Sequence, residues 1–326
     1  MSYDHRKYGA FRPVSGWQRK WPDQVIDRAP DWCAVDLRDG NQALVNPMTV
    51  EQKTQLFSLL VDIGCKEIEV GFPAASQPDF DFVRKIIETH MVPDDVSIQV
   101  LTQAREDLIA RSIESLKGAK KASIHLYNST STVQRERVFA MDREAIKGIA
   151  VQGARWIKDM VAQHPETEWE FQYSPESFTG TELEYAVEVV NAVIAVWQPQ
   201  AGQKVVINLP ATVETSTPNI YADMIEWMCA HIDHRDRVRI SLHTHNDRGC
   251  GVAAAELGVM AGADRVEGTL LGNGERTGNM CLVTMAMNLY SQGVEPKLDF
   301  SDMRRIVRTV EQCTGISTHP RHAYAG

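Results

Sequence analysis

The sequence predicts a (β/α)8 TIM barrel of the α/β class, with an N-terminal arm and a short C-terminal helical extension. Eight short apolar runs are each followed by a longer segment with helical spacing. Eight such units in about 260 residues are typical of a closed barrel. Polar residues follow most of these runs, and closure of the sheet would bring them round one mouth. An open doubly wound sheet is the main alternative.

The apolar runs predict strands at residues 32–36, 67–70, 96–101, 122–127, 169–173, 205–209, 238–242 and 265–270. Helical spacing follows at residues 49–61, 77–88, 105–116, 143–163, 182–196, 218–230, 249–261 and 278–292. The first helical segment opens with Thr49, a favourable N-cap residue, and places Leu56, Leu59 and Leu60 on one face. Strands that alternate with helices predict parallel strands joined by helical crossovers.

The chain divides into three predicted parts. Residues 1–31 are aromatic, basic and proline-containing, and we interpret them as an arm that lies on the fold or on a partner subunit. Residues 32–295 form the predicted catalytic barrel. In residues 296–326, Met303, Ile306 and Val310 recur at helical spacing and predict one more helix, after which a further subdomain would begin.

Composition narrows the class of protein. Hydrophobic residues make up 43% and charged residues 24%, which is ordinary for a soluble globular protein. The net charge of -9 argues against a nucleic-acid partner. No stretch approaches the roughly 18 apolar residues of a membrane span, and the first residues contain no apolar signal region. Six scattered cysteines without a Cys-x-x-Cys pair suggest reduced thiols. We therefore expect a soluble, cytoplasmic protein.

His243 and His245 predict a metal site at the end of the seventh strand. Side chains alternate along a strand, so both imidazoles point the same way and can bind one divalent metal. Asp39, after the first strand, would add a carboxylate oxygen, and Asn279 could add a carbonyl oxygen. This set of donors suits zinc, manganese or iron and tolerates magnesium. Such a metal can act as a Lewis acid on the carbonyl of a 2-oxo acid.

Arg38, beside Asp39, could stabilise negative charge that develops on that oxygen. It could also form a structural ion pair with Glu69, one of two acids within the second strand. The glycine-rich loop at 272–278 resembles a phosphate-binding nest, but its glycines could equally make a tight turn.

Further polar residues follow the fourth, fifth and sixth strands. His125 and Glu176 are candidates for proton transfer, or for orienting a base. Glu176 could instead cap the following helix, and His125 could be structural. Ser174 and Thr212 offer hydrogen-bond donors to a carboxylate.

Several motifs resemble a known family. The stretches at 37–42 (LRDGNQ), 243–247 (HTHND) and 272–279 (GNGERTGN) are similar to signatures of the 2-isopropylmalate synthase and homocitrate synthase group. This group belongs to the metal-dependent barrel superfamily that includes hydroxymethylglutaryl-CoA lyase. The stretches at 67–73, 125–131 and 173–182 more specifically resemble 2-isopropylmalate synthases.

The resemblance implies a homodimer that condenses acetyl-CoA with 3-methyl-2-oxobutanoate and hydrolyses the thioester, giving 2-isopropylmalate for leucine biosynthesis. It implies a divalent metal (Mg, Mn or Zn) on Asp39, His243 and His245, with Asn279 near or in its shell. Pro210 would line the pocket for the acid's side chain, and Glu275 would lie by the reacting centre. The oxo acid would be surrounded by Arg38, His125, Ser174, Glu176, Asn208 and Thr212.

Longer members of the family continue into helical subdomains and a regulatory domain, and residues there complete the site. The resemblance therefore implies that this chain is the barrel domain alone, and we expect it to bind metal and oxo acid but to turn over poorly. Homocitrate synthase or citramalate synthase, which accept other oxo acids, is the alternative within the family. A barrel that only binds an oxo acid is the non-catalytic alternative. Homocitrate synthase would need a cation for a second carboxylate, whereas Leu126, Pro210 and Ala211 are apolar.

Overall fold

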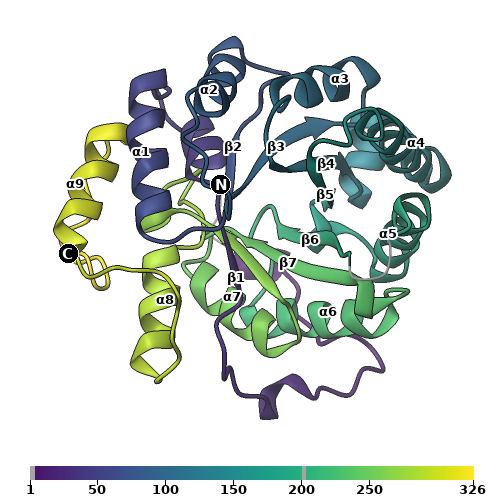
Figure 1. Cartoon of the computed structure of the whole chain (residues 1–326). Helices are drawn as coiled ribbons and strands as arrows, with labels where there is room; N and C mark the ends of the chain where they lie inside the picture. Colours follow the sequence, from purple (N-terminus) through teal and green to yellow (C-terminus); the bar gives the residue numbers. More distant parts are fainter. Residues whose placement is uncertain (1–3, 200–202) are drawn as a thin grey trace.

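The protein is described by a computed structural model that covers residues 4–199 and 203–326. Within these residues, eight parallel strands form one closed barrel in sequential order, β1 to β8 (Figure 1). The seam is closed by β1 and β8, which pair from Asp31 with Arg265 to Ala34 with Gly268. The predicted barrel is confirmed, and the open sheet is excluded.

The strands lie close to the apolar runs of the sequence. They are β1 (Asp31–Ala34), β2 (Glu67–Gly71), β3 (Ser97–Gln103), β4 (Lys121–Ser129), β5 (Glu168–Glu176), β6 (Val205–Ala211), β7 (Val238–Thr244) and β8 (Arg265–Gly268). Because all strands run in the same direction, their carboxyl ends open at one mouth.

Helices surround the barrel, and the apolar core lies between them and the strands (Figure 1). They are α1 (Val50–Asp62), α2 (Gln77–Glu88), α3 (Glu106–Ser115), α4 (Arg143–Val161), α5 (Leu183–Trp197), α6 (Pro218–His231), α7 (Gly251–Met260), α8 (Leu282–Ser291) and α9 (Met303–Thr314). Helix α9 packs outside the ring against α1. Among the described residues, no helix combines the length and apolar character needed to span a membrane.

Helix α1 begins where the sequence predicts. The Thr49 hydroxyl accepts a hydrogen bond from the Gln52 amide at 3.3 Å, and the Gln52 side chain accepts one from the Thr49 amide at 2.9 Å. This reciprocal capping box satisfies two amide groups at the start of the helix. Leu56, Leu59 and Leu60 are buried as expected.

The first strand is shorter than predicted. It ends at Ala34, and Asp36–Gly40 form a π-helical turn (η3) instead of continuing the strand. Asp36 is buried here, and its Oδ1 accepts a hydrogen bond from the Leu270 amide at 2.9 Å. The predicted last helix of the barrel likewise begins later, at Leu282, because Asn279 and Cys281 pair with His245 and Thr269 in short bridges.

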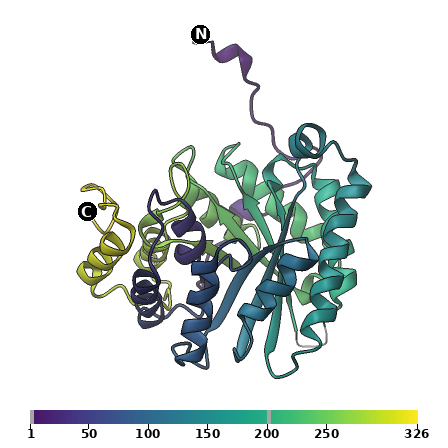
Figure 2. The ribbon, with the colours of Figure 1, turned by 90° about the horizontal axis from the view of Figure 1, so that it is seen from above.

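The N-terminal segment contacts helix α6. Asp223 accepts hydrogen bonds from Arg19 and from the buried Trp21 indole, and Glu226 accepts one from Trp17. Residues 5–10 are exposed and stand away from the barrel (Figure 2). The boundaries of arm, barrel and extension at residues 31 and 295 stay predictions.

The inside of the barrel is polar. Its buried side chains include two carboxylates, one guanidinium and two amides, contributed by Glu69, Glu267, Arg265, Gln99 and Gln172. Burial of such groups is costly unless they are paired, so their hydrogen bonds fix the geometry of the mouth above them.

Candidate active site

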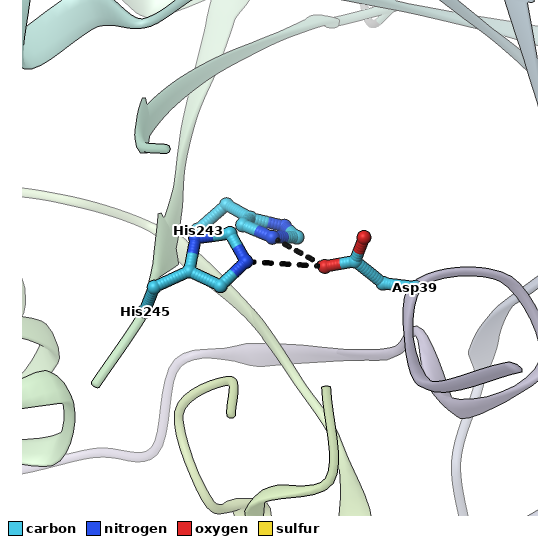
Figure 3. A group of neighbouring side chains, drawn as sticks. All are labelled: Asp39, His243 and His245. Atoms are coloured by element: carbon cyan, nitrogen blue, oxygen red, sulfur yellow. Dashed lines mark hydrogen bonds and ion pairs between the residues drawn. The ribbon is translucent and has the colours of Figure 1, made fainter. Parts of the chain in front are cut away.

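Asp39, His243 and His245 converge at the mouth of the barrel (Figure 3). The Asp39 Oδ2 lies 2.9 Å from His243 Nε2 and 3.5 Å from His245 Nε2. All three residues are buried, and one potential ligand atom from each lies within 4.8 Å of the others. The sequence-predicted triad therefore comes together, with Asp39 supplied by the π-helical turn and His243 by β7.

The donor atoms of this cluster fit a divalent metal. His245 Nδ1 lies 3.1 Å from the Ala211 carbonyl oxygen, so Nδ1 carries the proton and Nε2 presents a lone pair. Within the described residues, His245 Nε2 and Asn279 Oδ1 are buried without a hydrogen-bond partner. Asn279 Nδ2 donates to Asp39 Oδ2 at 2.6 Å, which brings the amide to the triad. Unpartnered buried acceptors next to a carboxylate are what a cation would satisfy.

Charges around the triad are strongly coupled. Burial alone would raise the pKa of Asp39, but Arg38 and the two histidines hold it well below its usual range. Burial alone would lower the pKa of His243, but hydrogen bonds to Asp39 and Glu267 raise it to about 9. A metal ligated by His243 would therefore displace a proton.

A cavity of about 220 Å³ opens beside the triad. Every residue predicted for the site lines it except Asn279, which donates a hydrogen bond to Asp39. The lining residues are Arg38, Asp39, Gln42, Phe72, Leu101, His125, Tyr127, Ser174, Glu176, Asn208, Pro210, Thr212, His243, His245 and Glu275. The cavity therefore joins the candidate metal cluster to a pocket with both polar and apolar walls.

Arg38 connects the triad to the rest of the cavity. Its Nη1 donates to Asp39 Oδ1 and its Nε to Glu69 Oε2, both at 2.5 Å. The expected ion pair with Glu69 is thus present, and Arg38 also lines the cavity. Burial opposes the charge of Arg38, but the Asp39 and Glu69 carboxylates raise its pKa, so it stays a cation.

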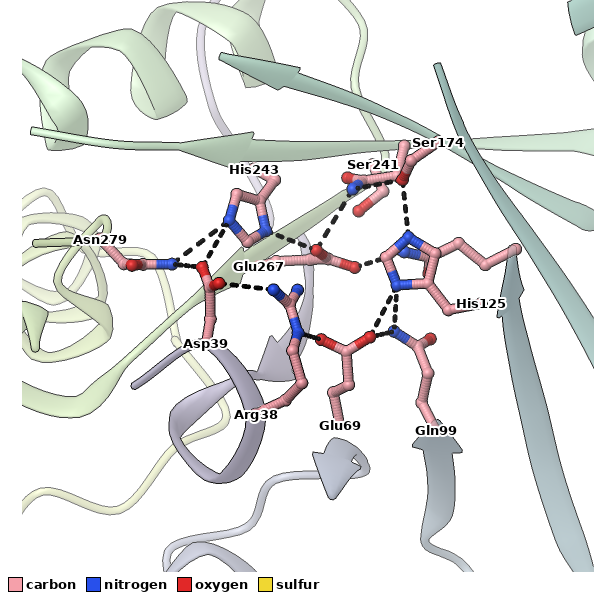
Figure 4. Close-up of polar contacts among 12 residues, drawn as sticks. Arg38, Asp39, Glu69, Gln99, His125, Ser174, Ser241, His243, Glu267 and Asn279 are labelled. Atoms are coloured by element: carbon pink, nitrogen blue, oxygen red, sulfur yellow. Dashed lines mark hydrogen bonds and ion pairs between the residues drawn. The ribbon is translucent and has the colours of Figure 1, made fainter. Parts of the chain in front are cut away.

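Arg38 and His125 lie on opposite sides of the Glu69 carboxylate (Figure 4). The Nδ1 of His125 lies 2.6 Å from Glu69 Oε1, and its Nε2 lies 2.7 Å from the Ser174 hydroxyl. Asn208 donates to the same hydroxyl at 3.0 Å. A chain of polar contacts therefore runs from Arg38 to Asn208 across the floor of the cavity.

Glu176 and Thr212 lie on the far wall. Glu176 accepts a hydrogen bond from the Ser129 hydroxyl, and helix α5 begins only after Glu182, so Glu176 does not cap that helix. Thr212 Oγ1 accepts a hydrogen bond from the Ser177 amide at 2.9 Å, which leaves its own hydroxyl hydrogen for a ligand.

The glycine-rich loop brings Asn279 and Glu275 to the mouth. A Cβ on Gly274 would lie 1.9 Å from Asn279 Oδ1, and Gly278 has a φ of +102° that favours glycine. Tight packing of the turn thus accounts for these glycines. Glu275 lies at the rim, where Gln42 donates to its Oε1 at 3.2 Å.

Comparison with known proteins places the chain in a family. The model of the HMGL-like family matches residues 29–310, which is most of the chain. The chain belongs to the HMGL-like family. The crystal structure of hydroxymethylglutaryl-CoA lyase from Pseudomonas aeruginosa shares the fold, with a TM-score of 0.71 and 17% identity over 91% of this chain and 96% of that one.

Two curated relatives are much closer in sequence. The 2-isopropylmalate synthase of Alcanivorax borkumensis is 63% identical over all 326 residues, and that of a Parafrankia strain is 63% identical over 98% of the chain. The chain spans 58% of the length of the first and 57% of the second. These relatives confirm the resemblance indicated by the motifs.

This member of the HMGL-like family also contains functional candidates that the sequence analysis missed. Glu267 is buried next to the triad, with its Oε2 2.7 Å from His243 Nδ1. Arg265 contacts the other oxygen of Glu267 at 2.8 Å. Two charged residues spaced two apart in a short apolar strand were the available signal, because such residues share a face. Phe72, Leu101 and Tyr127 were missed because apolar and aromatic residues in or next to strands usually belong to the core.

Proposed function

We propose that this chain is the catalytic barrel of a 2-isopropylmalate synthase. The reaction would join acetyl-CoA to 3-methyl-2-oxobutanoate, and water would then cleave the thioester to release CoA and 2-isopropylmalate. The observation that carries the proposal is 63% identity over the whole chain to a relative of that name. The convergence of the predicted residues on one cavity supports it. A cytoplasmic homodimer remains a prediction.

Mg²⁺, Mn²⁺ or Zn²⁺ would be held by Asp39, His243 and His245, with Asn279 Oδ1 as a further donor. When bound, the metal would supply Lewis acidity to the ketone of the oxo acid. Two imidazole nitrogens and two oxygens suit all three cations to different degrees.

The oxo acid would lie across the cavity. Ser174, Asn208 and Thr212 line it, and Thr212, whose hydroxyl hydrogen is left for a ligand, would donate to the carboxylate. Pro210 and Leu101 would contact the branched side chain, whose burial is favourable by roughly 25 cal/mol per Å². Among the described residues, Arg38 is the only lysine or arginine that lines the cavity, and it is already paired with two carboxylates. A second carboxylate, as in 2-oxoglutarate, would therefore lack a partner.

Arg38 would stabilise the negative charge that develops on the ketone oxygen when the new carbon–carbon bond forms. A base must remove a proton from the acetyl methyl group, and besides the metal-site Asp39 the carboxylates that line the cavity are those of Glu275 at the rim and Glu176 on the wall. His125, held by Glu69 on Nδ1, would orient Ser174 or pass on a proton through Nε2.

Calorimetric titration of the Mn²⁺-loaded chain with 3-methyl-2-oxobutanoate, pyruvate and 2-oxoglutarate tests this proposal. We expect the branched acid to bind most tightly. The double variant His243→Ala/His245→Ala should lose binding, and His164→Ala, on the surface, should retain it. Tighter binding of 2-oxoglutarate would favour homocitrate synthase, and binding of no oxo acid would contradict the proposed site.

A further inference from the structure

Glu267 lies in β8, and its carboxylate lies between His243 and His125 (Figure 4). Its side chain has no exposed surface. A buried carboxylate requires compensating donors, so its surroundings define what it does.

Four donors surround this carboxylate. Its Oε2 lies 2.7 Å from His243 Nδ1 and 3.3 Å from Asn208 Nδ2. Its Oε1 accepts hydrogen bonds from Arg265 Nη1 at 2.8 Å and Gln172 Nε2 at 2.7 Å. Because an ionised carboxylate only accepts, His243 must carry a proton on Nδ1 and present Nε2 to the triad.

The two histidines are therefore oriented by different acceptors. His245 uses the backbone carbonyl of Ala211, whose position is set by strand β6. The orientation of the His243 ring is instead set by the side chain of Glu267, so it depends on how well that carboxylate is held in place.

Arg265 holds the Glu267 carboxylate in place. It is fully buried and donates through Nη1 to Ser241 at 2.8 Å as well as to Glu267, and through Nε to Glu67 Oε2 at 2.6 Å. Hydrogen bonds at both ends of the guanidinium hold it in place, and its charge keeps Glu267 ionised.

We propose that Glu267 is a positioning residue that holds His243 as an Nε2 ligand and aligns Asn208 with Ser174, so that one buried carboxylate sets both the metal cluster and the oxo-acid pocket. This inference rests on the proposed metal site. A glutamine at this position has the same shape, but its NH2 group would face one of the four donors. Glu267→Gln therefore breaks the arrangement without creating a cavity.

Co²⁺ binding tests the inference, with Glu67→Gln as the matched control. That substitution removes the other carboxylate on Arg265 without touching a histidine. We expect Glu267→Gln to weaken Co²⁺ affinity about 10- to 100-fold and to change the visible absorption of the bound ion, and Glu67→Gln to leave both unchanged. Equal Co²⁺ affinity and spectra in the two variants would overturn the proposed role of Glu267 but not the metal site. Absence of Co²⁺ binding by the unaltered chain would overturn the metal site and this role together.

A measurement on the unaltered chain does not depend on the folding of a variant. ¹⁵N NMR of ring-labelled histidine in the Zn²⁺-loaded protein, with the His243 signals assigned by their loss in His243→Gln, reads the protonated nitrogen directly. We expect the proton on Nδ1. A proton on Nε2 would overturn the inference.

Discussion

At the scale of residues, the sequence motifs identified some of the side chains at the mouth of the barrel but not how they are arranged. The motifs identified Arg38, Asp39, His243 and His245 because charged residues after apolar runs are conspicuous. They did not identify which atoms face inward, because that depends on partners far away in sequence. Asp36 and Gly274 illustrate the point, since their importance is visible only from their surroundings.

Gly274→Ala tests how closely the glycine-rich loop must approach Asn279. The added Cβ would lie 1.9 Å from Asn279 Oδ1, so the loop or the amide must move. We expect the free energy of unfolding to fall by about 1–3 kcal/mol and Mn²⁺ affinity to weaken in calorimetric titration. Gly148→Ala is the matched control, because nothing lies within 4 Å of its added Cβ in helix α4. Gly148→Ala should raise the free energy of unfolding by about 0.5–1 kcal/mol. Unchanged Mn²⁺ affinity in Gly274→Ala would contradict the expected effect of the loop on Asn279.

Asp36 makes stability depend on pH. Burial raises its pKa to about 7, and its Oδ2 is buried without a partner among the described residues. Between about pH 4 and 7 the folded chain keeps a proton that the unfolded chain has lost, so the free energy of unfolding falls as the pH rises through this range.

Asp36→Asn removes this titration and keeps the acceptor for the Leu270 amide. We expect the variant to gain about 2 kcal/mol relative to the unaltered chain between pH 5 and pH 8. Urea unfolding of both proteins at the two pH values, with a chelator present, measures the difference. A difference that does not change with pH would show that Asp36 is ionised throughout.

At the scale of elements, apolar runs and helical spacing predicted the eight strands and the eight α-helices that follow them, because strands buried on both faces are continuous apolar runs in the sequence. It did not predict the π-helical turn at Asp36–Gly40 that presents Asp39. This turn is held by contacts from other elements. Lys53 of α1 donates to the Leu37 carbonyl at 3.1 Å and to Asp79 of α2 at 2.5 Å, and Asp79 accepts from the Phe72 amide at 2.8 Å.

Loss of one partner from the buried Lys53–Asp79 ion pair should destabilise the chain far more than loss of one partner from a surface pair. Lys53 has 1% of its side chain exposed and Asp79 11%, so removal of one partner leaves a buried charge. We expect Lys53→Met to lower the free energy of unfolding by about 3–5 kcal/mol. Lys66→Met, which breaks the exposed pair with Asp95, should cost about 1 kcal/mol or less.

The double variant Lys53→Met/Asp79→Asn separates the ion pair from packing. The amide that replaces the carboxylate leaves no buried charge, and its oxygen can still accept a hydrogen bond from the Phe72 amide. The double variant should therefore be more stable than Lys53→Met alone. Urea unfolding of the unaltered chain, the two single variants and the double variant provides the comparison. Strictly additive losses would mean that the two side chains act independently.

At the scale of the whole molecule, barrel closure brings Asp39 within 2.9 Å of His243, a residue 204 positions away. The sequence predicted this meeting, because parallel strands in a closed barrel end at one mouth. It did not predict the polar interior beneath. The sequence pattern placed Arg265 and Glu267 in an apolar run, and only the structure shows that both are buried and form an ion pair.

A metal bound by this cluster would link the first strand of the barrel to the last two, because Asp39 follows β1, His243 lies in β7, and His245 and Asn279 follow β7 and β8. A ligand that binds only the folded chain at 100 times its Kd adds about 2.7 kcal/mol, which corresponds to a rise in Tm of about 4 °C for a chain of this size. We therefore expect Mn²⁺ or Zn²⁺ to raise Tm and a chelator to reverse the rise. His243→Ala/His245→Ala should show no change with either. An equal rise in that variant would place the stabilising cation elsewhere, and no rise in the unaltered chain would mean that these residues do not bind the metal when folded.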